Sequence, residues 1–107
     1  MKDVAVIDNV NNANILAQVV GELFGHWPYI LNTVEEARGY SKQKFDVVIM
    51  GEMDGKYKEI YPMMKADDKS VYTSNENVIQ ECKKIGIRAI KNTGNFGRDL
   101  GGILQWT

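Results

Sequence analysis

Four short apolar runs of the sequence each end in a small, polar or charged residue: Asp8, Gly51, Thr73 and Lys91. If the runs are parallel strands, these residues meet at one edge of one sheet. Asp8 and the neutral Asn9 would hold Mg²⁺ weakly, because Mg²⁺ favours an octahedral oxygen shell that includes carboxylates. We therefore expect no cofactor. A lysine that closes an apolar strand needs a partner, so Lys91 could pair with Asp8, or Asp8 could instead accept hydrogen bonds from the following turn; in either case we expect both residues to serve the structure.

Hydrophobic periodicity predicts five strands that alternate with five helices. Strands are expected over residues 3–8, 27–31, 45–50, 70–73 and 87–91. This alternation predicts an α/β fold with a parallel sheet between two layers of helices, in the flavodoxin-like strand order 2-1-3-4-5. The chain of 107 residues suits a single domain over residues 1–107. Pro62 is expected to kink or divide the third helix.

Three residues receive structural interpretations. Thr73 begins a capping-box pattern with Glu76 and is expected to cap the fourth helix. His26 has no acid–base partner at an evident spacing and is expected at the surface or in a loop. Cys82 lies on the apolar stripe of its helix and is expected in the core.

The composition narrows the class of partner. The net charge of −1 provides no general attraction to nucleic acid or to anionic lipid. No apolar run has the length needed to cross a bilayer, and the first residues lack an apolar stretch of signal-peptide type, so we expect a cytoplasmic protein. The single cysteine excludes an internal disulfide.

Five short stretches, in this order along the chain, resemble the receiver domain of two-component response regulators. They are Val-Ile-Asp8-Asn9, Asp46-Val-Val-Ile-Met-Gly51, Met53-Asp54-Gly55, Tyr72-Thr73-Ser74 and Ile90-Lys91-Asn92. The resemblance implies a flavodoxin-like fold and a phosphoryl-switch pocket, with Thr73 as the switch hydroxyl.

The departures from that family gather at the same pocket. Asn9 replaces the second acid of the first strand, and Gly51 stands at the phosphoacceptor position. The loop before Met53 is shorter than in the family, Asn92 replaces a proline, and Arg88 stands at the switch aromatic. A glycine has no side chain to attack phosphorus. The neighbouring Glu52 could fill the pocket, pair with the lysine and mimic the phosphorylated charge.

The first hypothesis is therefore a degenerate pseudo-receiver that takes no phosphate and acts by binding a protein, either another protein or a second copy of itself. In the receiver family, partners use the surface of the fourth helix, fifth strand and fifth helix. The corresponding residues here are Asn77, Gln80, Glu81, Lys84, Arg88, Arg98 and Gln105.

Two alternatives remain open. The strand edge could bind a small anion, a nucleotide or a phosphate, through Lys91, Thr73 and a glycine loop that contains Gly94, Gly97 and Arg98. An atypical phosphoreceiver could instead use an acid beside Gly51, either Glu52 or Asp54, or use Asp8. No nucleophile–base pair is apparent, so we expect no enzymatic activity.

Overall fold

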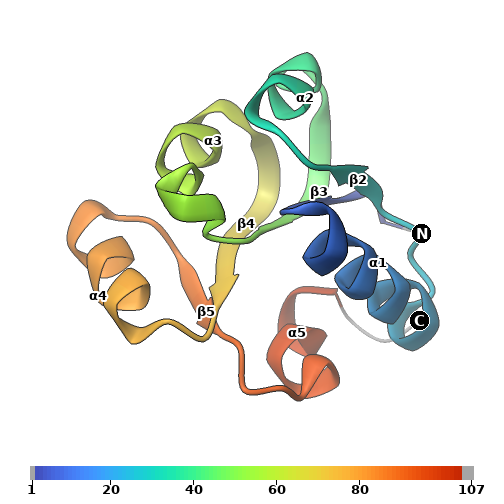
Figure 1. The fold of residues 1–107 in the computed structure, drawn as a ribbon. Helices are drawn as coiled ribbons and strands as arrows, with labels where there is room; N and C mark the ends of the chain where they lie inside the picture. The colour runs from blue at the N-terminus through green and yellow to red at the C-terminus, as the bar shows by residue number, and fades with distance from the viewer. Residues whose placement is uncertain (1, 105–107) are drawn as a thin grey trace.

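The computed structural model describes residues 2–104 of the chain, and Gln105 of the expected partner surface lies outside that part. Figure 1 shows strands and helices alternating along the whole described chain. The strands are β1 (Val4–Ile7), β2 (Tyr29–Leu31), β3 (Lys44–Met50), β4 (Lys65–Thr73) and β5 (Ala89–Lys91). The helices are α1 (Val10–Phe24), α2 (Val34–Gly39), the short 3-10 helix η1 (Met53–Gly55), α3 (Tyr57–Met63), α4 (Glu76–Ile85) and α5 (Phe96–Leu104).

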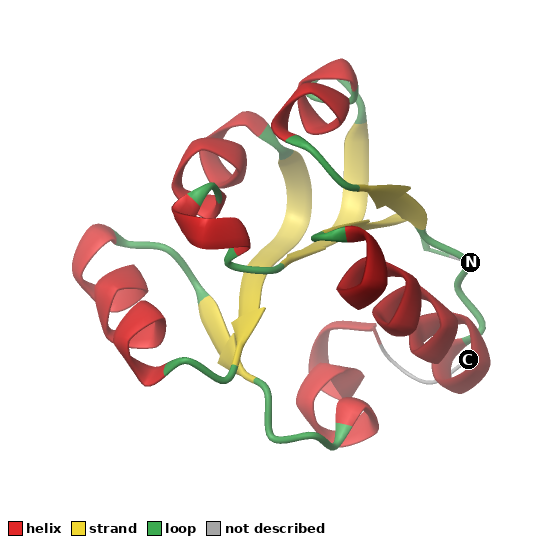
Figure 2. Cartoon of the chain, in the orientation of Figure 1, coloured by secondary structure: helices red, strands yellow, loops and turns green. Residues whose placement is uncertain are grey.

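The strands form one parallel sheet in the order β2-β1-β3-β4-β5, which confirms the predicted flavodoxin-like architecture. Helices α1 and α5 cover one face, and α2, α3 and α4 cover the other (Figures 1 and 2). Each face has its own apolar core, because alternate residues of the central strands point to opposite sides. Val47 and Ile49 face α1 and α5, whereas Val48 and Met50 face α2 and α3.

Strand β4 begins five residues earlier than the predicted start at Ser70. Its first half carries charged residues, which the sequence pattern does not identify as strand. The register explains this composition: the first half pairs with β3 from Lys65 onward, but pairing with β5 begins at Val71. The first half therefore forms a sheet edge, where charged side chains are tolerated.

Helix α3 runs unbroken from Tyr57 to Met63, so the predicted division at Pro62 is wrong. The proline lacks one helical hydrogen bond, but it is the next-to-last residue of α3, so almost no helix follows it that it could separate. The ammonium of Lys69 donates hydrogen bonds to the backbone carbonyls of Tyr61 at 2.7 Å and of Met64 at 3.1 Å. These bonds satisfy carbonyl groups at the helix end.

His26 lies in the loop between α1 and β2, as one of its two expected positions, but it is 2% exposed and therefore not at the surface. Its Nδ1 accepts a hydrogen bond from the backbone N–H of Lys2, and its Nε2 lies 3.3 Å from the carbonyl oxygen of Leu104. The imidazole therefore joins the two ends of the described chain. Cys82 is fully buried, as predicted.

Candidate functional site

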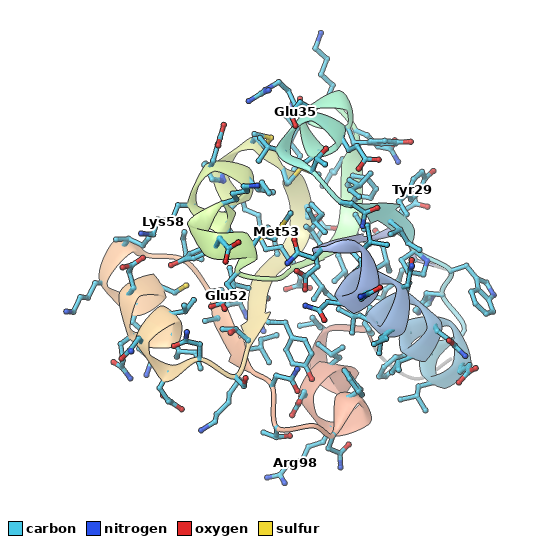
Figure 3. All side chains as sticks on the ribbon, in the orientation of Figure 1. Tyr29, Glu35, Glu52, Met53, Lys58 and Arg98 are labelled. Carbon is cyan, nitrogen blue, oxygen red and sulfur yellow. The ribbon has the colours of Figure 1, made fainter. Side chains whose placement is uncertain are left out.

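A cavity of about 410 Å³ lies beyond the carboxyl ends of the strands. Its lining includes Asp8 and Asn9 after β1, Gly51 and Glu52 after β3, and Thr73 at the end of β4. The strand order reverses between β1 and β3, and open parallel sheets hold ligands in the crevice at such a switch point. Figure 3 shows Glu52 and Met53 at the centre of the view, where these strand ends meet. These five residues of the predicted pocket therefore lie together, whereas the sixth, Lys91, does not line the cavity.

The carboxylate of Asp8 occupies the space directly beside the Cα of Gly51. A Cβ atom at position 51 would collide with the Asp8 carboxylate carbon and both of its oxygens. Asp8 is held there by a hydrogen bond of 2.8 Å, which its Oδ1 accepts from the backbone N–H of Asn9. Gly51 is therefore matched to Asp8, because any larger residue would require that carboxylate to move.

Burial raises the pKa of the Asp8 carboxyl above its ordinary value. The hydrogen bond from Asn9 lowers that pKa in part, and the nearby charge of Glu52 raises it further. Desolvation and a neighbouring negative charge both disfavour an ionised carboxylate. Asp8 is thus a half-buried acid whose described surroundings contain no ion-pair partner for it.

Lys91 does not pair with Asp8, so that alternative is wrong, whereas the hydrogen bond from Asn9 to Asp8 confirms the alternative in which Asp8 accepts from the following turn. Its ammonium lies 2.6 Å from a carboxylate oxygen of Glu76, at the start of α4, and both side chains are exposed. This hydrogen bond lowers the pKa of the Glu76 carboxyl. Lys91 is also absent from the cavity lining. The exposed ammonium of Lys91 is solvated, so it can pair with Glu76 without a desolvation cost. The reason for expecting a buried partner for Lys91 therefore does not apply.

Thr73 lines the cavity but does not cap α4, which corrects the predicted capping box. The cap is Asn75, whose Oδ1 accepts hydrogen bonds from the backbone N–H groups of Asn77 and Val78. Thr73 is 8% exposed, and its Oγ1 accepts a hydrogen bond of 3.1 Å from the backbone N–H of Asn75. The threonine therefore supports the turn before the cap.

The glycine loop before α5 uses backbone N–H groups in hydrogen bonds within the loop. The backbone N–H of Gly94 donates to Asn92, and that of Arg98 donates to the Oδ1 of Asn95. Gly97 and Arg98 do not line the cavity, and Figure 3 shows Arg98 projecting outward at the lower edge of the molecule. The predicted anion loop thus has the backbone N–H groups of Gly94 and Arg98 already in use, and its glycines and arginine do not line the cavity.

The loop is fastened to β4 by Asp99. Its Oδ2 accepts hydrogen bonds from the Tyr72 hydroxyl at 2.6 Å and from the backbone N–H of Thr93 at 2.9 Å. Its Oδ1 accepts a further bond from the Thr93 hydroxyl at 2.7 Å. Burial raises the pKa of the Asp99 carboxyl, but the bonds from Tyr72 and Thr93 outweigh it and keep the pKa below its ordinary value.

The expected partner surface is partly engaged within the chain. Asn77, Gln80 and Lys84 are exposed on α4. Glu81, which is half-buried, accepts a hydrogen bond of 2.8 Å from the Tyr57 hydroxyl and forms an ion pair with Lys58. Arg88 pairs with Asp68 of β4 at 3.0 Å. The exposed part of α4 is therefore the portion left open to another molecule.

Sequence reasoning did not place several lining residues at the cavity. Asn12 and Ile15 come from the first half of α1, and Phe96 begins α5. Helices that follow parallel strands begin at the carboxyl edge of the sheet, so their opening residues could have been assigned to the cavity from the fold alone. Tyr72 and Asn92 complete this side of the lining.

The loop between β3 and α3 is unusual in its backbone. Met53 and Asp54 both have left-handed conformations, with φ angles of 50° and 54°. Residues with a Cβ reach this region at a cost of about 1–2 kcal/mol each, so the surroundings must hold them there. Met53 is 3% exposed and packs in the core, which anchors the turn at the cavity rim.

Comparisons with family models, curated proteins and solved structures find no match to this chain. Within residues 2–104, no helix is both long and apolar enough to cross a membrane. The same residues contain no group of three or more histidine, cysteine or acidic side chains placed to hold a metal ion.

Proposed function

We propose that this chain is a phosphorylation-independent pseudo-receiver that acts as a regulatory protein-binding domain. The observation that carries the proposal is the position of the Asp8 carboxylate, which fills the space where a phosphoacceptor side chain at position 51 would begin. A glycine covered by a carboxylate offers no nucleophile to phosphorus. The flavodoxin-like sheet order supports the receiver-like scaffold.

The charges around the cavity also argue against a phosphate. Asp8, Glu52 and Asp54 line it, and its lining within residues 2–104 contains no lysine or arginine. A phosphoryl group would meet like charges there, which raise its energy further in a partly desolvated site. This arrangement speaks against both the anion-binding and the phosphoreceiver alternatives.

Acetyl phosphate and Mg²⁺ test the first half of the proposal, with intact-mass measurement as the readout. We expect no phosphorylated species under conditions in which a functional receiver domain, treated in parallel, is labelled. A phosphorylated form of this chain would overturn the proposal.

A partner screen tests the second half, with the chain as bait and a matched pair of variants. Gln80→Arg with Lys84→Glu alters the exposed face of α4, and Gln18→Arg alters α1 as a control. We expect a partner, or a second copy seen by sedimentation, that wild type and the control retain and the α4 variant loses. Equal retention by all three would refute the use of α4.

A further inference from the structure

A groove of about 520 Å³ lies between α3 and α4, apart from the cavity at the strand ends. Its lining includes residues from α3, from β4 and from the end of α4 and the loop that follows: Lys58, Tyr61, Pro62, Lys69, Ile85 and Ile87. Figure 3 shows Lys58 on the side of α3 that faces α4. Within residues 2–104, the charged side chains of this lining are lysines, with no acid among them.

The α4 side of the groove leaves apolar side chains in contact with water. Ile85 follows the buried Ile79 and Cys82 on the apolar stripe of α4, yet it is 51% exposed. Ile87 is half-buried, and Pro62 on the α3 side is exposed. An apolar side chain placed in the groove would remove these surfaces from water, which favours binding.

The ammonium of Lys69 is held in place at the groove. It lies 4.4 Å from the centroid of the Tyr61 ring, and it donates to the carbonyls of Tyr61 and Met64 at the end of α3. The Tyr61 hydroxyl donates in return to the backbone carbonyl of Lys69 at 3.3 Å, which fixes the ring. An ammonium has three N–H donors, and no acceptor for the third is found within residues 2–104.

The charge of Lys69 has no counter-ion among the ion pairs of the described residues. The carbonyls at the end of α3 carry only partial negative charge. Burial lowers the pKa of the Lys69 ammonium below its ordinary value, because desolvation disfavours the charged form. A ligand carboxylate would supply both the missing counter-charge and an acceptor for the third N–H group.

Neighbouring acids do not provide that carboxylate, because they are already paired with other cations. Glu81 of α4 forms its ion pair with Lys58, and Asp68 of β4 forms its ion pair with Arg88. The positive charge in excess therefore belongs to Lys69. The groove thus combines an apolar wall with one uncompensated cation, and both are complementary to a segment that carries acidic and apolar side chains.

We propose that this groove docks an acidic, apolar peptide segment of a partner protein, with a carboxylate beside Lys69 and an apolar side chain against Ile85 and Ile87. A peptide suits the groove better than a free carboxylate does, because neighbouring side chains of one chain use the cation and the apolar wall together. The proposal goes beyond the proposed function. It places docking between α3 and α4 rather than on the exposed face of α4, and it holds whether or not the chain accepts phosphate.

A titration followed by the amide resonances of the isotope-labelled protein tests the charge requirement and locates the site. The probe is the peptide Glu-Leu-Leu-Glu-Leu, capped at both ends, and the uncharged match is Gln-Leu-Leu-Gln-Leu. We expect the acidic peptide to shift the amides of Lys69 and of residues 85–87, and those of Asp8 and Gly51 to stay in place. The uncharged peptide should bind about tenfold more weakly, as the loss of a charged hydrogen-bond partner implies.

Two matched pairs of variants assign the binding to the groove. Ile85→Ala should weaken it about fivefold, the change that corresponds to roughly 40 Å² of lost apolar contact. Ile15→Ala removes an isoleucine of similar exposure from α1 and should leave binding unchanged. Lys69→Met should weaken binding about tenfold. Arg98→Met makes the same charge change on exposed residue 98 of α5, which covers the other face of the sheet, and should have no effect.

Several results would overturn the proposal. They are equal binding of the uncharged peptide, equal weakening by either control variant, and shifts at the strand-end cavity instead of the groove. Sodium acetate that binds as tightly as the peptide would indicate an anion site, and groove shifts that grow with protein concentration alone would indicate a second copy as the occupant. Circular dichroism checks the fold of each variant. If Lys69→Met is unfolded, the two peptides and the two isoleucine variants decide the outcome.

Discussion

Replacing Gly51 by alanine is the sharpest test of the packing at the strand ends. The backbone at position 51 is not left-handed, so the substitution itself carries no conformational penalty. Its new methyl group collides with the Asp8 carboxylate and forces that group to leave. The carboxylate then loses its hydrogen bond from Asn9.

The magnitude follows from two opposing effects. A hydrogen bond to a charged group contributes about 1.5 kcal/mol at the lower end of its range, which suits the exposed Asn9. Alanine in place of glycine restricts the unfolded chain and returns about 0.5 kcal/mol. We therefore expect Gly51→Ala to lower the free energy of unfolding by about 1 kcal/mol.

The same substitution should have the opposite sign once the carboxylate is absent. In an Asp8→Ala background, Gly51→Ala meets no obstacle and should stabilise the fold by about 0.5 kcal/mol. Urea unfolding of wild type, the two single variants and the double variant gives a coupling free energy of about 1.5 kcal/mol. Additive effects, or an unchanged stability of Gly51→Ala alone, would refute the close packing of Asp8 over Gly51.

Three further predictions concern separate contacts. The raised pKa of Asp8 means that the folded protein favours the protonated carboxyl, so the stability that this group contributes is present at low pH and lost as pH rises. Asp8→Asn should therefore have a higher urea midpoint than wild type at pH 7, and this difference should shrink toward pH 4. A difference that stays constant with pH would contradict the role of burial. His26→Phe keeps an aromatic ring but loses the hydrogen bonds to Lys2 and Leu104, and it should lower the free energy of unfolding in urea by about 1–3 kcal/mol. His26→Gln should recover part of this loss. An unaltered urea midpoint would show that the imidazole contacts contribute nothing to stability. Asn75→Ala should lower the free energy of unfolding in urea by about 1 kcal/mol, because α4 loses its cap. Thr73→Ala should lower it less, because Thr73 does not cap the helix. The reverse order of the two effects would restore the capping-box interpretation.

The fold was predictable because its signals are repetitive. Val4–Ile7 and Val47–Met50 are continuous apolar runs, as expected for strands covered on both faces, and glycines follow the apolar stripes of α1 and α4. The strand order then follows from right-handed crossovers and a single reversal. The set of residues at the strand ends was obtained by the same reasoning.

Side-chain partners at those ends were less predictable. Lys91 ends β5, which β3 and β4 separate from β1 and Asp8, and the sequence does not indicate that Glu76 at the start of α4 lies beside that lysine. His26 follows a helix and precedes an exposed tryptophan, a context typical of a surface loop, yet its ring is buried and contacts Lys2 and Leu104, at the two ends of the described part of the chain. Such contacts depend on where distant segments come together, which local pattern does not contain.

The charged first half of β4 has a consequence for how copies of this protein meet one another. Exposed strand edges present unpaired N–H and carbonyl groups to which a second chain can add. Here the open stretch carries Lys65, Asp67 and Lys69 among its residues, and the two outermost strands, β2 and β5, have three residues each. Few unpaired groups and a dense run of charge protect the sheet from aggregation by edge-to-edge addition.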